Sequence, residues 1–389
     1  MEIHDTPALT FDDVLLKPGF AGFGRPDIDL STQLTRRIRL RLPLVSAPMD
    51  TVTESRLAIA LGAFGGIGII HRNLTIRDQA AQVAIVKQAG QLVGAAVGSS
   101  PGYEARVKAL VDAGADVIVV DSAHGFSKNV VDATRHIKAA HRIDVIAGNI
   151  ATGEGAEALI QAGADGLRVG MGPGAICTTR IVSGMGVPQL TAILESAKVA
   201  RAHGIPVIAD GGINYFGDLT KALAAGASSV MMGRLFAATE EAPGDVIVFR
   251  KDQVPARFRS IIKDSETEVY KFKTYRGMGS VGAMERGKAI SSEDEFHGKS
   301  FTSKSVLVAE GVEGLVPSSG DLATVASSML EGLRSGFYYV GAVNIERLWE
   351  TAVLRRITSA SLTESHPHDL FITNAGNSYP IESGRGSAS

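Results

Sequence analysis

Eight short apolar runs, mostly about 20 to 30 residues apart, constrain the fold of this chain more than any other feature. Small or polar residues follow each run, and then comes a segment with the period of an amphipathic helix. Eight such units predict an α/β fold, a closed (β/α)8 TIM barrel, whereas an open doubly wound sheet would not explain so regular a count. The expected strands are Leu44–Ser46, Gly66–Ile70, Leu92–Val97, Val117–Val120, Val145–Ala147, Gly166–Val169, Val207–Ala209 and Ser229–Met232.

The approach to the strand repeats in three of these units. Ala113-Gly-Ala-Asp116 and Ala162-Gly-Ala-Asp165 share one pattern, and Ala225-Gly-Ala-Ser228 differs only in its last residue. The glycine in each is typical of a helix C-cap. The pattern therefore indicates a helix that ends directly before a strand.

Catalytic groups of a barrel lie on the loops that follow the strands. Glycines follow the last two strands, in Asp210-Gly-Gly-Ile213 and Gly233-Arg234, and expose backbone N–H groups near helix starts, where barrels bind phosphate. We expect a phosphorylated ligand there, with plain tight turns as the alternative. The other candidate loops are Ser46–Asp50, His71–Asn73, Asp121–Gly125 and Gly148–Asn149.

The loop after the sixth strand, Arg168–Arg180, carries three chemical features at once. Gly170, Gly172 and Gly174 alternate with other residues, so the backbone can turn sharply and present N–H and C=O groups to an ion. Cys177 is the only cysteine of the 389 residues, and its polar neighbours favour a reactive thiolate. The loop predicts a nucleophile; the alternative is that Cys177 is a small buried apolar residue.

Composition limits the classes of ligand. The chain is 45% hydrophobic and 21% charged, with a formal net charge of −2, so nothing indicates a nucleic-acid stripe or a membrane surface. The apolar runs are of strand length, and a single cysteine cannot form an intrachain disulfide. No secretion signal opens the sequence, so we expect a cytoplasmic protein with small ligands.

The periodic pattern stops after the eighth strand. We expect residues 242–320 to form a long insertion within a single catalytic domain spanning 1–389. Its polar stretch, about 285–305, is expected to be a mobile flap, with a disordered surface loop as the alternative. We also expect an irregular strap over 1–40, a last helix over Asn344–Ile357 and a disordered tail over 370–389.

Five motifs occur together in this chain: Leu9-Thr-Phe-Asp-Asp-Val-Leu-Leu16, Asp50-Thr-Val-Thr-Glu54, Gly65-Gly-Ile-Gly-Ile-Ile-His71, Gly170–Arg180 and Tyr275-Arg-Gly-Met-Gly-Ser280. In this combination, over about residues 1–370, the chain resembles the family of IMP dehydrogenase and GMP reductase. The resemblance implies the barrel, and an oxidoreductase in which Cys177 attacks C2 of a purine nucleotide. A nicotinamide cofactor, NAD or NADP, would exchange hydride with that carbon.

The same resemblance implies roles for matching residues. Thr179 would lie beside the reacting carbon, and Asp210 would hold the ribose hydroxyls. The other substrate contacts would be Ser46, Met49, Gly277, Met278 and Gly279, with Gly212, Gly233, Arg234 and Tyr275 around the phosphate. The cofactor contacts would be Asp121, Ser122, Asn149 and Arg168.

A potassium site and a homotetramer are also implied by the resemblance. The carbonyl groups of Gly172, Gly174 and Cys177 would ligate the potassium ion. Glu364 and Ser365 from a neighbouring subunit would complete the site.

Three departures from the family pattern bear on the reaction. Only about 20 residues, 71–91, separate the second and third strands, so the pair of regulatory domains usual there in dehydrogenases is absent. Ala175 replaces a phosphate-binding serine, a loss that Arg234 would offset. Asp294 and Glu295 stand where dehydrogenases carry an Arg-Tyr pair that activates water.

The missing Arg-Tyr pair favours reductive deamination of GMP or a guanine-like nucleotide, such as a deazaguanine, because that reaction needs no activated water. Against it, Val281 replaces the glutamate of reductases, and the tail with Glu364 resembles that of dehydrogenases. The alternative is oxidation of IMP to XMP, with Glu310, Asp294 or Glu295 assisting water. An inactive nucleotide-binding paralogue and a flavin-dependent barrel are further alternatives.

Overall fold

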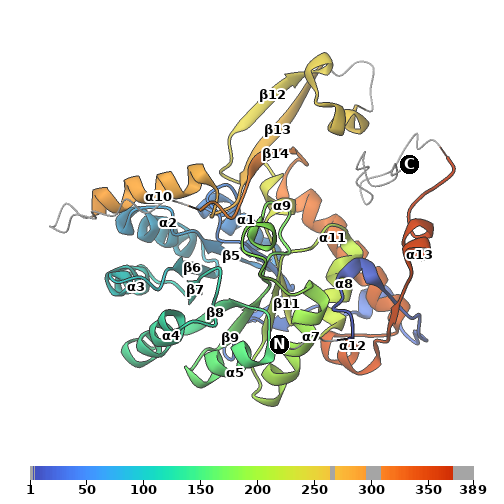
Figure 1. Cartoon of the computed structure of the whole chain (residues 1–389), viewed down its shortest axis with the longest axis horizontal. Helices are drawn as coiled ribbons and strands as arrows, with labels where there is room; N and C mark the ends of the chain where they lie inside the picture. The colour runs from blue at the N-terminus through green and yellow to red at the C-terminus, as the bar shows by residue number, and fades with distance from the viewer. Residues whose placement is uncertain (1–2, 4, 263–267, 295–307, 371–389) are drawn as a thin grey trace.

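The computed structural model describes residues 3, 5–262, 268–294 and 308–370. Eight parallel strands close into a barrel with helices around the outside (Figure 1), and β11 pairs with β4 to complete the ring. The predicted TIM barrel is confirmed. Its strands are β4 (Leu44–Ser46), β5 (Ile67–Ile70), β6 (Val93–Val97), β7 (Val117–Asp121), β8 (Asp144–Ile150), β9 (Gly166–Val169), β10 (Val207–Asp210) and β11 (Ser229–Met232).

The outer helices begin at polar caps that the sequence supplies. The side chains of Thr75, Thr152 and Asp321 each accept a hydrogen bond from a backbone N–H of the first helical turn. Helix α2 alone connects β5 to β6, so no regulatory domain lies between these strands. The helices are α1 (Ser55–Phe64), α2 (Ile76–Gln88), α3 (Tyr103–Asp112), α4 (Lys128–Ala140), α5 (Gly153–Gln161), α6 (Thr179–Val182), α7 (Gln189–Ala202), α8 (Phe216–Ala224), α9 (Arg234–Ala237) and α11 (Leu322–Val340).

The barrel interior is a packed apolar core, and the N-terminal strap closes it at the N-terminal ends of the strands. The short strands β2 (Thr32–Gln33) and β3 (Arg39–Leu40) form a hairpin across the strand N-termini. Leu34 and Leu40 of this hairpin are buried in the same cluster as Val45, Ile67 and Ile208 of the barrel strands. A ligand that reaches the barrel strands would therefore approach from the opposite end, where the strands terminate.

The insertion after the barrel has a sheet of its own. Strands β12 (Val246–Arg250), β13 (Val269–Arg276) and β14 (Glu313–Pro317) form an antiparallel sheet that stands away from the barrel (Figure 1). The short 3-10 helices η3 (Lys251–Gln253) and η4 (Ala256–Ile261) follow β12. Helix α10 (Val281–Asp294) occupies the first part of the expected flap, and residues 295–307 of the flap lie outside the described residues.

The C-terminal segment corrects one prediction. Helix α12 (Ile345–Thr351) ends early, and the expected helix over Asn344–Ile357 is wrong in its second half. Strand β15 (Leu354–Arg356) lies there instead, because it pairs with β1 (Val14–Leu16), a partner that local periodicity cannot reveal. The remaining elements are η1 (Phe11–Asp13), η2 (Arg25–Asp27) and α13 (Ser359–Glu364), and the tail 371–389 lies outside the described residues. No helix in the described part of the chain is long and apolar enough to cross a membrane.

Candidate functional site

The half-buried thiol of Cys177 lies at the C-terminal mouth of the barrel, at one end of a short hydrogen-bonded chain. Its Sγ donates to Thr179 Oγ1 at 3.2 Å, and Thr179 Oγ1 donates to Glu310 Oε2 at 3.1 Å. Both donors therefore point from sulfur toward the carboxylate. This arrangement can carry a proton from a nucleophile to a base.

Residues 310–312 hold this series of hydrogen bonds in place, because they bridge two loops that are far apart in the sequence. Glu310 accepts from Thr178 N–H through its carbonyl at 2.9 Å, and its own N–H donates to the Gly279 carbonyl at 3.1 Å. Val312 bridges the same loops in the opposite sense, since its N–H donates to the Ile176 carbonyl at 2.9 Å and its carbonyl accepts from Gly277 N–H at 3.1 Å. The structure thereby brings the loop of Cys177 and the loop 277–279 to one place.

The loop of Cys177 takes a backbone path that requires glycine. Gly172 has a φ of +80°, and a Cβ built on it would lie 2.6 Å from the side chain of Arg180. A Cβ on Gly170 would lie 2.1 Å from the carbonyl oxygen of Asp210. Arg180 fixes the loop by donating through Nη2 to the Val187 carbonyl at 2.8 Å. The loop is therefore held tightly against the end of β10.

A ladder of charged side chains crosses the mouth from strand to strand. Arg168 on β9 donates to Asp210 Oδ2 at 2.9 Å and to Asp121 Oδ1 at the end of β7. Asn149 on β8 donates to the same Asp210 oxygen at 2.8 Å, and Arg72 reaches Asp121 Oδ2 at 3.4 Å. Burial raises the pKa of Asp121, but Arg168 and Arg72 outweigh burial and hold that pKa below its usual value. Asp121 is therefore an ionised acceptor at the mouth.

Tyr275 and Met49 face each other across Gly233. A Cβ on Gly233 would lie 2.6 Å from Tyr275 Oη and 3.1 Å from Met49 Sδ, so no side chain fits between them. Burial raises the pKa of Tyr275, Asp210 raises it further and Arg234 opposes the rise, so the phenol keeps its proton. The backbone of Gly211 is also left bare, because its φ is +89° and its Cβ would lie 3.0 Å from Pro173. This corner presents a phenol donor and exposed backbone, which suits an anion.

The other predicted residues are more scattered. Ser46 is buried and accepts from Thr53 Oγ1 at 2.8 Å, while the backbone of Ser122 is bonded to Gly148 and Asn149. Asp294 is the last residue of α10, and Glu295 lies outside the described residues. Gly212 and Arg234 follow β10 and β11, Met278 lies in the loop between β13 and α10, and Glu364 and Ser365 lie at the end of α13.

Within the described ranges, no group of three or more histidine, cysteine, aspartate or glutamate side chains is placed to hold a metal ion. The carbonyl groups of Gly172, Gly174 and Cys177 are a different kind of ligand, and Gly174 already accepts the Cys177 N–H at 3.0 Å. A carbonyl oxygen has a second lone pair, so this bond does not prevent ligation.

Sequence reasoning gave no role to several residues that organise the mouth. Gln189 is buried, and its amide donates to the carbonyls of Val169 and Asp210 at 3.0 Å each, which joins the ends of β9 and β10. Arg276 forms two hydrogen bonds with the carboxylate of Asp50. Its place directly after Tyr275 was the available signal, because a cation beside a site residue needs a partner when it is buried.

Comparison with known proteins agrees with this geometry. A family model described as the IMP dehydrogenase / GMP reductase domain matches residues 8–368. Proteins named inosine-5'-monophosphate dehydrogenase are similar throughout. The one from Aquifex aeolicus is 40% identical over 96% of this chain and 98% of its own, and that from Cryptosporidium parvum is 42% identical over 95% and 97%. The one from Rhodopirellula baltica is 38% identical over 95% of this chain and 88% of its own.

The match extends over nearly the whole chain, and the barrel with its cysteine loop gives it a structural basis. The resemblance inferred from the motifs is thereby confirmed. The chain belongs to the IMP dehydrogenase / GMP reductase family of oxidoreductases.

Proposed function

We propose that this protein is an IMP dehydrogenase, which converts IMP, NAD and water into XMP and NADH. The observation that carries the proposal is the chain from Cys177 through Thr179 to Glu310, because it supplies a base that can act on water without an Arg-Tyr pair. The relatives named inosine-5'-monophosphate dehydrogenase support the same reaction. The slight preference for reductive deamination of GMP, drawn from the flap sequence, therefore gives way to its alternative.

The nucleotide would lie across the mouth from the glycine turns to the thiol. Its phosphate would bind the backbone of Gly212 and Gly233 beside Tyr275 and Arg234, where no side chain intrudes. Its ribose hydroxyls would donate to Asp210. The base would then reach Cys177 past Met278, with Ser46, Met49, Gly277 and Gly279 as the remaining contacts.

Covalent catalysis would begin with proton transfer. The thiol proton of Cys177 passes to Thr179 as the hydroxyl proton of Thr179 passes to Glu310, which leaves a thiolate. The thiolate attacks C2 of IMP, and the hydride leaves that carbon with its electron pair. Once Glu310 has released its proton to solvent, it accepts a proton from water through Thr179. The resulting hydroxide adds to C2, the C–S bond breaks and XMP leaves.

The residues at the mouth fit a nicotinamide cofactor. Asp121 is ionised and only partly covered, with a side-chain exposure of 14%, so its oxygens can accept from a ribose diol. Ser122 directly follows Asp121 in the chain, and Asn149 and Arg168 lie on the next two strands, β8 and β9. Bound NAD supplies the acceptor for the hydride that leaves C2. The ladder through Arg168 would orient Asp121 toward that cofactor.

A potassium site and a homotetramer belong to the same proposal. Carbonyl oxygens on a glycine-rich turn suit potassium, and Gly172, Gly174 and Cys177 supply them on one short loop. Glu364 and Ser365 of a second copy would complete the site. Replacing potassium by sodium in the assay should lower the rate, and sedimentation should give four chains per particle. Equal rates in the two salts would contradict the ion site.

The reaction can be decided with purified protein. We expect IMP with NAD to raise the absorbance of reduced cofactor, and GMP with NADPH to give no oxidation of the cofactor. Asp294 and Glu295 can be tested in parallel, since Asp294→Asn and Glu295→Gln should retain turnover if Glu310 is the base. Turnover of GMP with no turnover of IMP would reverse the proposal.

A further inference from the structure

We propose that Asp50, Arg276 and Asn73 form a positioning cluster that holds the nucleotide-binding loop 275–279 and the start of α10 against the barrel. The proposal rests on the proposed function, because it concerns how tightly this loop presents its groups to the nucleotide. None of the three residues is placed to touch the reacting carbon. Asp50 and Arg276 act through their sequence neighbours Met49 and Tyr275, and Asn73 acts through its bonds to Asp50 and to α10.

The first link is a bidentate ion pair between the barrel and the insertion. Arg276 Nε donates to Asp50 Oδ1 at 3.0 Å, and Nη2 donates to Asp50 Oδ2 at 2.6 Å. Arg276 N–H also donates to Thr51 Oγ1 at 3.2 Å. Asp50 follows β4, and Arg276 ends β13, so this pair fixes the end of the insertion strand to a barrel loop.

The neighbours of these two residues show why the pair matters for binding. Met49 precedes Asp50, and Tyr275 precedes Arg276, and the two flank Gly233 at the expected phosphate corner. Both side chains come within 3.1 Å of the position that a Cβ on Gly233 would occupy. The Asp50–Arg276 pair therefore sets the spacing of two groups that face the same ligand.

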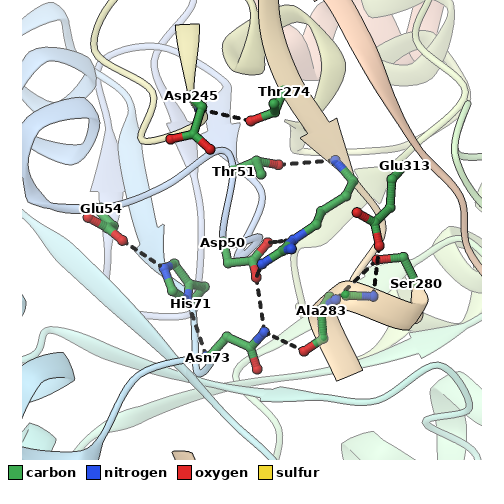
Figure 2. A network of polar contacts seen from close by, with 12 residues as sticks. Asp50, Thr51, Glu54, His71, Asn73, Asp245, Thr274, Ser280, Ala283 and Glu313 are labelled. Carbon is green, nitrogen blue, oxygen red and sulfur yellow. Dashed lines mark hydrogen bonds and ion pairs between the residues drawn. The ribbon is translucent and has the colours of Figure 1, made fainter. Parts of the chain in front are cut away.

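Asn73 extends the cluster to α10. Its amide Nδ2 donates to Asp50 Oδ2 at 3.0 Å and to the Ala283 carbonyl at 2.9 Å (Figure 2). Its Oδ1 would lie 2.9 Å from a Cβ on Gly287. Ala283 and Gly287 are four residues apart, so they lie on one face of the helix. The small side chains on this face allow α10 to approach the loop after β5.

The loop that carries Asn73 is itself held in place by His71 and Glu54. Asn73 N–H donates to His71 Nδ1 at 3.1 Å, so the proton of the buried imidazole is on Nε2, which donates to Glu54 Oε1 at 3.2 Å. Asp50 is fully buried as a side chain. Burial raises its pKa, and the donors Arg276 and Asn73 lower it further than burial raises it, so the carboxylate remains charged. The cluster is therefore a buried network in which the carboxylate of Asp50 has its hydrogen-bond donors, and not an exposed ion pair.

The test compares this pair with a similar one at the other end of the barrel. Asp144 is also buried, and it accepts from Arg37 Nε at 2.7 Å and Thr35 Oγ1 at 2.6 Å, far from the mouth. We expect Asp50→Asn and Arg276→Lys to raise the KM for IMP about tenfold, with kcat changed less than about threefold. We expect Asp144→Asn to lower the melting temperature and leave both constants unchanged.

A second readout does not depend on turnover. The rise in melting temperature on adding IMP should shrink in Asp50→Asn and Arg276→Lys and stay at the wild-type value in Asp144→Asn. Asn73→Ala keeps both charges and should give a smaller rise in KM, about threefold, which tests the cluster if Asp50→Asn does not fold. Wild-type KM and wild-type thermal shifts in the three cluster variants would overturn the proposal.

A wrong assignment of the reaction would give a different result from a wrong assignment of the cluster. If wild-type protein turned over GMP instead of IMP, the assigned reaction would be wrong. The cluster could then be tested with GMP by the same thermal shift, because both nucleotides carry the 5′-phosphate that Tyr275 faces. Loss of that shift in Asp50→Asn would support the cluster, and an unchanged shift would refute it.

Discussion

The two ends of the barrel use carboxylate–cation pairs in different ways. At the strand N-termini, Asp165 accepts from the backbone N–H of Val145 at 2.9 Å and from Lys138 Nζ at 2.7 Å. Asp116 repeats this arrangement with the first residue of β6 and a lysine of α2. These carboxylates bind the start of the neighbouring strand directly. They stabilise the barrel and face no ligand.

At the mouth, the carboxylates are held by side chains. Asp210 accepts from Arg168 and Asn149, and Asp121 accepts from Arg168 and Arg72. Charge and orientation are thus fixed by long side chains from other strands, and lone pairs remain for a ligand. A substitution at the strand N-termini should therefore change stability, whereas a substitution at the mouth should change binding or chemistry.

The largest effect is expected at the thiol. Cys177→Ala removes the nucleophile and should reduce kcat by about 10⁴-fold or more, because no group on this loop can replace sulfur. Intact-mass measurement should detect a nucleotide adduct on wild-type protein during turnover and none on the variant. The variant should keep the wild-type melting temperature within about 1 °C, since the thiol is only half-buried. An adduct on Cys177→Ala would place the nucleophile elsewhere.

Glu310→Gln should have the next largest effect. The amide keeps the size of the side chain and can still bond Thr179, but it cannot accept a proton, so kcat should fall about 10²-fold. Single-turnover measurements should show slower hydride transfer as well as slower release of XMP, because Glu310 accepts a proton before each of these steps. A variant with wild-type kcat would assign water activation to another group, with Asp294 and Glu295 next to be tested.

The repeated pattern Ala-Gly-Ala-Asp shows how much of the barrel could be predicted from sequence. Each copy ends a helix at glycine, with a φ of +92° at Gly114 and +96° at Gly163, and begins a strand, as expected. Such signals lie within a few residues of each other. The pairing of β15 with β1 joins residues about 340 apart and leaves no periodic trace, which is why the last helix was predicted too long.

The site divides in the same manner. Cys177 and Thr179 belong to one loop and could be identified together, and the glycines around them reflect real steric limits. The bond between Arg276 and Asp50 spans 226 positions, and Gln189 acts through backbone carbonyls of two other strands. Contacts of this kind depend on the closed barrel, so the sequence alone could not supply them.

A smaller effect is expected at the N-terminal ends of the barrel strands. Asp165→Asn should lower the free energy of unfolding by about 2 kcal/mol, because a carboxylate that bonds Val145 N–H and Lys138 becomes an amide that leaves the lysine unpaired. Urea denaturation measures this change, and steady-state kinetics should give wild-type kcat and KM. A changed KM would remove the distinction between the two ends of the barrel.

The smallest expected effect is a pH dependence of the unfolding free energy that comes from Asp50 at the mouth. Hydrogen bonds from Arg276 and Asn73 overcome burial and hold the pKa of Asp50 below its usual value. A group whose folded pKa is depressed stabilises the protein above its unfolded pKa, about 3.9, and this contribution is lost as the pH falls through the folded pKa. The difference in unfolding free energy between wild type and Asp50→Asn should therefore be constant near neutral pH and shrink in acid. Urea denaturation at a series of pH values measures it, and a difference that did not change with pH would mean that the pair acts through packing alone.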